Sequence, residues 1–171
     1  MNGHLSIVSY LYSAVLLRTI GARDQTNLRA WKNENRQFFF YKEIISETAQ
    51  QEWFRKYQTR EHDYMFIVLA NGLEIGCMGV RMLEATWDVY NVILGNTQFA
   101  KKGFMGQAFQ LMCSFAITVS PMRISAQVLN SNPALSWYTH NAFQIVVNRT
   151  DHVEIELDQS RFVPCPITWL N

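Results

Sequence analysis

The chain has 171 residues, a length that suits one domain able to bury roughly two thirds of its unfolded surface. Hydrophobic residues make up 49% of the chain and charged residues 17%, which excludes a disordered or collagen-like protein. The formal net charge of +1 provides no long-range attraction to nucleic acid or to an anionic membrane, so an anionic ligand must be held by local geometry.

The cysteines and histidines do not follow the spacing of a metal site. Cys77, Cys113 and Cys165 are an odd number without the C-x-x-C pattern, and the first two lie within apolar runs. This arrangement predicts reduced, buried thiols in a cytoplasmic protein. The four histidines are scattered along the chain, so we expect no metal.

The N-terminal stretch from Leu5 to Leu17 is apolar. No Lys or Arg precedes it, no A-x-A site closes it, and it is shorter than the ~18 residues needed to span a bilayer. We therefore interpret residues 1–13 as an arm or an extra strand that leads into a single domain at 14–171. A signal peptide is the alternative.

The first half of the domain predicts one strand and two helices. Residues 14–20 form a β-like run, and Asp24 then offers an N-cap for a short helix containing Leu28 and Trp31 at helical spacing. Ser46 caps a second amphipathic helix, whose aromatic stripe is typical of a core-facing surface.

Three strands follow as an antiparallel meander. Residues 64–70 and 74–83 flank Asn71-Gly72, the strongest short hairpin signal in the chain, and residues 87–95 alternate with β-branched side chains.

The remaining chain alternates helices and strands. Apolar spacing predicts a helix over 106–118, a strand over 123–129 and a helix that opens at Asn132-Pro133. Residues 143–147 and 153–157 predict a closing hairpin. The element order is thus β-α-α-β-β-β-α-β-α-β-β, an α/β (α+β) fold with a mixed, mostly antiparallel sheet of about seven strands and about four helices.

The segment 100–107 has the form of a phosphate-binding turn. A strand that enters a glycine-bearing turn and then a helix directs backbone N–H groups and the positive end of the helix dipole at one place. Gly103 lets the backbone approach a ligand, Gly106 eases entry into the helix, and Lys101 and Lys102 add positive charge. An ordinary surface loop is the alternative interpretation.

Tyr138 is a candidate general acid. It follows Ala134 by four residues, so both lie on one face of the helix that begins after Pro133. A phenol, whose unperturbed pKa is near 10, can donate a proton to a leaving thiolate, whose conjugate acid has a pKa near 8.5. A core tyrosine bonded to backbone is the alternative.

Together these two segments resemble motifs of the GNAT acetyltransferase superfamily, specifically its ribosomal-protein-alanine and nucleotide-amino-sugar branch. The resemblance spans residues 14 to 158 and rests on Ala100-Lys-Lys-Gly103-Phe-Met-Gly-Gln-Ala108 and on Asn132-Pro-Ala-Leu-Ser-Trp-Tyr138-Thr-His-Asn-Ala-Phe143. Ala100, Met105 and Ala142 depart from the family pattern, although main-chain amides rather than these side chains would hold a pyrophosphate.

The resemblance implies a GNAT fold and an N-acetyltransferase with acetyl-CoA as cosubstrate. The pyrophosphate would bind the amides of 101–106, the pantetheine would lie along the end of the third meander strand, and Asn132 would fix the coenzyme or the loop. The implied coenzyme-binding residues are Leu94, Gly95, Lys101, Lys102, Gly103, Phe104, Met105, Gly106 and Asn132. Tyr138 would protonate the coenzyme sulfur after an amine attacks the thioester directly.

The general base is left open among three carboxylates. Glu84 and Asp88 flank the turn into the third meander strand, and Glu74 lies on the preceding strand. A solvated turn residue is the alternative for Glu84 and Asp88.

The acceptor is expected to be a small amine, with an amino-sugar nucleotide favoured over a protein N-terminus. The aromatic runs 38–41 and 87–90 could stack on a base or a sugar ring, although 38–41 also fits a core. A non-catalytic acyl-CoA-binding module and an enzyme for longer acyl groups are the alternatives. We expect a cytoplasmic monomer or homodimer without nucleic-acid or membrane partners.

Overall fold

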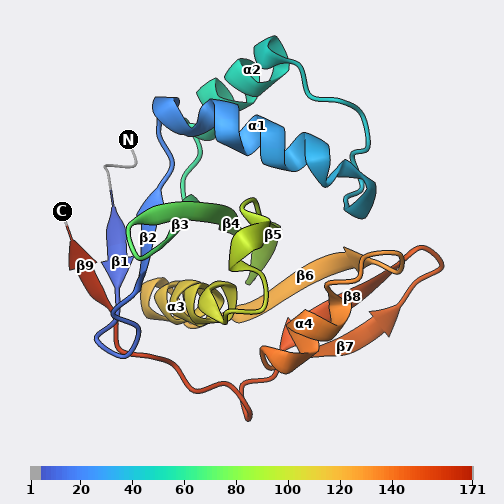
Figure 1. The fold of residues 1–171 in the computed structure, drawn as a ribbon. Helices are drawn as coiled ribbons and strands as arrows, with labels where there is room; N and C mark the ends of the chain where they lie inside the picture. Colours follow the sequence, from blue (N-terminus) through green and yellow to red (C-terminus); the bar gives the residue numbers. More distant parts are fainter. Residues whose placement is uncertain (1–4, 171) are drawn as a thin grey trace.

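The computed structural model describes residues 5–170, and the N-terminal residues 1–4 of the predicted arm lie outside this range (Figure 1). Its described part contains a mixed sheet in the order β7-β8-β6-β5-β4-β3-β2-β1-β9. The strands are β1 Ser6–Val8, β2 Val15–Thr19, β3 Asp63–Ala70, β4 Leu73–Leu83, β5 Thr86–Leu94, β6 Arg123–Leu129, β7 Phe143–Asn148, β8 His152–Leu157 and β9 Thr168–Leu170. The α-helices are α1 Gln25–Glu34, α2 Glu47–Tyr57, α3 Phe104–Val119 and α4 Leu135–His140.

The predicted fold class is confirmed, and the sheet is wider than predicted. The antiparallel meander is β3, β4 and β5, and β5 pairs with β6 in parallel. Over residues 5–170 the sheet has nine strands rather than about seven, because β1 and β9 extend its β2 edge. Residues 6–8 of the expected arm or extra strand are β1, whereas β9 has three residues, too few for a periodic pattern to reveal.

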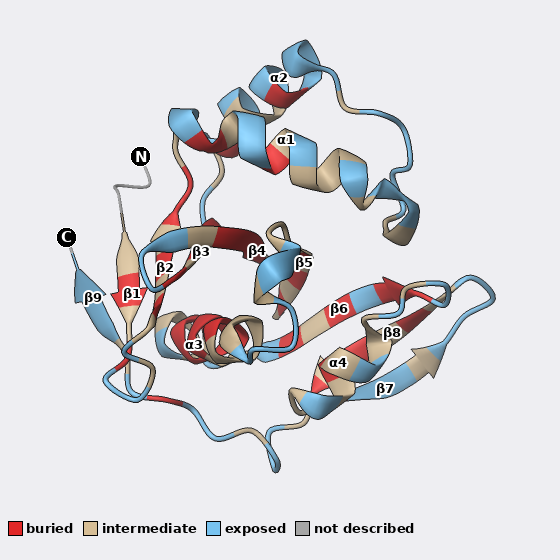
Figure 2. Ribbon diagram, viewed as in Figure 1, coloured by how far each residue is buried: buried red, intermediate tan, exposed pale blue. Residues whose placement is uncertain are grey.

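Helices cover both faces of the sheet (Figure 1). Strand alternation turns Phe66 toward α3 and its neighbour Ile67 toward α1 and α2, and both side chains are fully buried. Figure 2 shows the resulting buried stripes on the central strands and on α3. The three cysteines are buried and unpaired, as predicted. Among the described residues, no helix combines the length and apolarity needed to cross a membrane.

The neighbouring strands β5 and β6 separate after a short paired stretch. Only residues 86–88 pair with residues 123–125, although β5 continues to Leu94 and β6 to Leu129. In the same stretch β5 contains a bulge opposite Met78, where Asn91 adopts a left-handed φ of 50°. The separation opens the sheet between β5 and β6, and the bulge re-aims the β5 side chains there.

Candidate functional site

A cavity of about 510 Å³ lies where β5 and β6 separate. Its walls come from α1 and the loop that follows it, from α2, from β4, β5 and the end of β6, and from the β6–α4 connection and α4. Its lining residues include Lys32, Phe38, Phe39, Phe40, Tyr41, Trp53, Arg60, Arg81, Asp88, Tyr90, Asn91, Leu94, Asn132, Trp137 and Tyr138. Of the predicted site residues, the structure thus brings Asp88, Leu94, Asn132 and Tyr138 together around one space.

The turn before α3 presents a set of free amides. Gly103 is the N-cap of α3 with a φ of +82°, and a Cβ built there would meet nothing within 4 Å, so backbone conformation rather than space requires glycine. Within residues 5–170, none of the amides of 102–106 donates a hydrogen bond to the protein. Together with the positive end of a 16-residue helix, these amides suit an anion such as a pyrophosphate.

The turn is a neighbour of the cavity rather than part of its wall. A Cβ on Gly106 would lie 3.2 Å from Oδ1 of Asn141, the C-cap of α4. Tyr138, on the same short helix, lines the cavity. Lys102 stacks its ammonium 5.2 Å from the ring centroid of Phe99, and Lys101 has a left-handed φ of 60°. The turn 101–106 therefore lies next to the helix that contributes Tyr138 to the cavity wall.

Tyr138 lines the cavity and is held by aromatic neighbours. Phe109, Trp137 and Phe143 contact the ring at centroid distances of 5.7, 5.2 and 5.8 Å, and the side chain is only 7% exposed. The hydroxyl forms no hydrogen bond with any residue of the described chain. Burial, with smaller effects of Cys113 and Asp88, raises the pKa of Tyr138, so the phenol keeps its proton at neutral pH.

Asp88 lines the cavity from β5. Its Oδ2 is 2.8 Å from Nη2 of Arg81 on the neighbouring strand β4. Burial raises the pKa of Asp88, and the charge and hydrogen bond of Arg81 offset this only in part. Glu84 is exposed on the β4–β5 turn and does not line the cavity.

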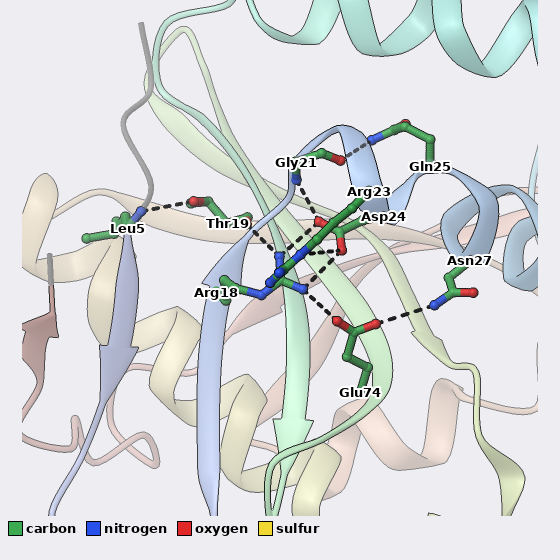
Figure 3. Close-up of polar contacts among 9 residues, drawn as sticks. All are labelled: Leu5, Arg18, Thr19, Gly21, Arg23, Asp24, Gln25, Asn27 and Glu74. Atoms are coloured by element: carbon green, nitrogen blue, oxygen red, sulfur yellow. Dashed lines mark hydrogen bonds and ion pairs between the residues drawn. The ribbon is translucent and has the colours of Figure 1, made fainter.

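Glu74 belongs to a different cluster, at the start of α1 (Figure 3). Its Oε1 is 2.8 Å from Nη2 of Arg18, whose other nitrogen Nη1 is 2.9 Å from Oδ2 of Asp24. Asn27 donates to the second oxygen of Glu74. This carboxylate is therefore occupied in positioning α1 on the sheet.

The end of β5 and the β6–α4 connection are tied to helix α1 and its loop. A Cβ on Gly95 would lie 2.2 Å from Cε2 of Trp31, so the indole packs directly on this glycine. Asn132 accepts a hydrogen bond from the amide of Ala134 and donates one of 3.3 Å to the carbonyl of Phe38. Asn132 thereby holds the loop after α1 across the cavity.

The sequence interpretation missed several cavity residues. Lys32 and Arg60 lie in polar stretches of the sequence, and Trp53 belongs to the aromatic stripe that the sequence pattern assigns to the core. Only the folded chain brings these three side chains to β5. Trp87, by contrast, was a candidate for stacking and is fully buried, with its indole N–H donating to the carbonyl of Ser120. Within the described part of the chain, no group of three His, Cys, Asp or Glu side chains could hold a metal ion.

A split mixed sheet with an amide-rich turn beside the split defines an acyltransferase of the acyl-CoA-dependent type. The family model described as "Acetyltransferase (GNAT) domain" matches residues 14–136, and the chain belongs to this family. Membership confirms the predicted enzyme class, N-acetyltransferase, and its acyl donor, acetyl-CoA. No curated protein matches the sequence significantly.

Several solved structures share the fold. A spermidine N-acetyltransferase from Vibrio cholerae in complex with CoA and spermine has a TM-score of 0.72 and 19% identity, with 88% of this chain and 98% of that chain covered. FdhC, a nucleotide-linked sugar GNAT, has a TM-score of 0.74 and 15% identity, with coverage of 95% and 93%. RimL, a ribosomal L7/L12 acetyltransferase bound to coenzyme A, has a TM-score of 0.68 and 12% identity, with coverage of 84% and 93%.

Proposed function

We propose that the protein transfers the acetyl group of acetyl-CoA to a primary amine by direct attack, without a covalent enzyme intermediate. The observation that carries this proposal is Tyr138, which lines the cavity and whose hydroxyl has no hydrogen-bond partner in the described chain, while a turn of free amides lies beside the same helix. Both a proton donor and an anchor for a pyrophosphate are thus available around one split in the sheet.

The residues of the cavity have distinct roles in this reaction. Asp88, or a water molecule bound to it, accepts a proton from the acceptor ammonium, and the freed amine forms the new bond to the thioester carbon. A β5 amide at the bulge stabilises the negative charge that develops on the carbonyl oxygen. Tyr138 donates its proton to the sulfur as the carbon–sulfur bond breaks, and its raised pKa means that the phenol starts the reaction protonated.

We infer that the acceptor is an amino-sugar nucleotide. The aromatic side chains of residues 38–41, with Trp53 and Tyr90, line the cavity and offer flat faces to a sugar ring or a base. The nucleotide-linked sugar enzyme FdhC has the same fold over most of both chains. A protein N-terminus, the acceptor named for RimL, is the second candidate. The three unpaired cysteines support a reducing, cytoplasmic location.

The test measures thiol release from acetyl-CoA by the purified protein with a panel of amines. We expect turnover with amino-sugar nucleotides to exceed turnover with N-terminal peptides. Calorimetry without an acceptor measures CoA binding separately. Failure to bind CoA would refute the proposal, and binding without turnover of any amine would favour a non-catalytic acyl-CoA-binding module.

A further inference from the structure

Lys32 places an ammonium group inside the cavity, on the side of α1. Its Nζ donates a hydrogen bond of 2.6 Å to Oδ1 of Asn91 at the β5 bulge and lies 3.1 Å from the ring centroid of Phe39. It also lines an adjoining apolar cavity of about 310 Å³, whose walls share Trp53 and Tyr41 with the main one. Lys32 therefore stands at the junction of the two spaces, framed by aromatic rings.

Within residues 5–170, no carboxylate forms an ion pair with Lys32. The cavity lining contains two other cations, Arg60 and Arg81, and each pairs with an aspartate, Asp63 and Asp88 respectively. Asp88 is the single acidic residue among the lining residues of the described chain, and Lys32 forms no ion pair with that part of the protein. The cavity thus carries one unneutralised positive charge.

Such a charge is costly unless a ligand completes its environment. A partly buried ammonium without an anion loses hydration that one neutral hydrogen bond does not fully replace. Burial accordingly lowers the pKa of Lys32 to about 8, which still leaves the group mostly protonated at neutral pH. Of the three donors on Nζ, Asn91 engages one, so another is available to an incoming anion.

We propose that Lys32 binds a phosphate group of the acceptor and selects phosphorylated amino sugars over polyamines. The inference rests on the proposed function and names the residue that sets its specificity. Asn91 lies three residues from Asp88 along β5, so their Cα atoms are at most roughly 10 Å apart, and the bulge at Asn91 shortens this separation. Asp88 and the Lys32 ammonium bound to Asn91 therefore lie close enough to engage an amine and a phosphate carried by one sugar ring.

A polyamine lacks what this cavity offers. A second ammonium of such an acceptor would approach Lys32 and be repelled, and the carboxylates Asp63 and Asp88 already pair with arginines. Although the chain shares its fold with the Vibrio cholerae spermidine N-acetyltransferase, we therefore do not expect it to use a polyamine as its acceptor.

Three acceptors and three proteins test the inference. Glucosamine 1-phosphate, glucosamine and spermidine are each measured with the wild type, Lys32→Gln and Lys32→Arg. We expect the wild type to prefer glucosamine 1-phosphate over glucosamine by on the order of 10-fold to 100-fold in kcat/KM, the strength of a charge-assisted hydrogen bond. Lys32→Gln should lose this preference mainly through KM, whereas Lys32→Arg should keep most of it.

A binding measurement separates this inference from the proposed function. Calorimetry with the CoA-saturated protein should show glucosamine 1-phosphate binding at least about 10-fold more tightly than glucosamine, with the difference lost in Lys32→Gln. That result without turnover would refute the acetyl transfer and leave the phosphate site standing. Equal binding of the two sugars by the wild type, or a preference unchanged in Lys32→Gln, would overturn the role of Lys32. Thermal unfolding checks that both variants fold.

Discussion

The hydroxyl oxygen of Tyr138 is the proposed proton donor to the coenzyme sulfur. Removing that atom in Tyr138→Phe keeps the ring in its contacts with Phe109 and Phe143, so we expect little change in the melting temperature. The value of kcat should fall on the order of 10²-fold, the usual contribution of a general acid, with a smaller effect on KM. Thiol release measures both constants. A kcat equal to that of the wild type would show that the sulfur receives its proton elsewhere.

Asp88 and Glu84 can be separated as candidate bases by their pH dependence. Because burial raises the pKa of Asp88, kcat/KM should fall as the pH drops through that raised value and the carboxylate gains a proton. Asp88→Asn should lower kcat/KM by about 10²-fold or more and remove this acidic limb. The exposed Glu84 provides the matched variant: Glu84→Gln should leave rate and pH profile unchanged. An acidic limb that persists in Asp88→Asn would exclude Asp88 as the base.

At the scale of elements, the turn before α3 depends on one left-handed residue. Gly103 and Gly72 both have a positive φ, and at both positions an added Cβ would meet no other atom. The same substitution should therefore destabilise the fold at both positions through backbone strain alone, by about 1–2 kcal/mol. Gly103→Val should shift the amides of 102–106 and weaken CoA binding on the order of 10-fold or more. Gly72→Val, in the β3–β4 hairpin, should cost similar stability without affecting CoA. Calorimetry and thermal unfolding of the two variants decide whether the turn holds the coenzyme.

Elements that form through contacts between residues close in sequence are predicted well, and elements that form through contacts between distant residues are not. The β3–β4 hairpin and helix α3 depend on neighbouring residues, and both were predicted to within about two residues at each end. The β5 bulge at Asn91 and the three-residue β9 depend on pairing partners, which carry no local signal. The same difference applies to the candidate site residues. Gly103 is predictable from a local turn pattern, whereas Lys32 reaches the cavity only through the packing of α1 on β5.

At the scale of the whole molecule, one buried ion pair joins α1 to the sheet. Arg18 on β2 pairs with Asp24, the residue directly before α1 (Figure 3). Asp24 is 1% exposed and also accepts a hydrogen bond from the amide of Gly21. The packing of α1 in turn places Trp31 on Gly95 and Lys32 on Asn91. The cavity geometry therefore depends on a contact outside it, because α1 supplies one of its walls.

This dependence predicts how the fold responds to acid. Burial alone would raise the pKa of Asp24, but the hydrogen bonds from Arg18 and Gly21 outweigh it and hold the pKa below its ordinary value. A depressed pKa contributes stability above the unfolded value of about 3.9, and this contribution disappears as the pH falls through the folded value. Asp24→Asn should therefore show a flatter loss of stability below about pH 4 than the wild type.

At neutral pH the same variant should be destabilised by about 3 kcal/mol, since it removes the buried carboxylate that Arg18 contacts and leaves the guanidinium only the partly exposed Glu74. For a chain of this size that corresponds to a melting temperature roughly 6–12 °C lower. Glu154→Gln is the matched control, because Glu154 pairs with Arg149 at the similar distance of 2.8 Å but in solvent, and should change stability by less than about 1 kcal/mol. Equal melting temperatures for the two variants would mean that the Arg18–Asp24 pair does not anchor α1, and the cavity wall would then depend on apolar packing alone.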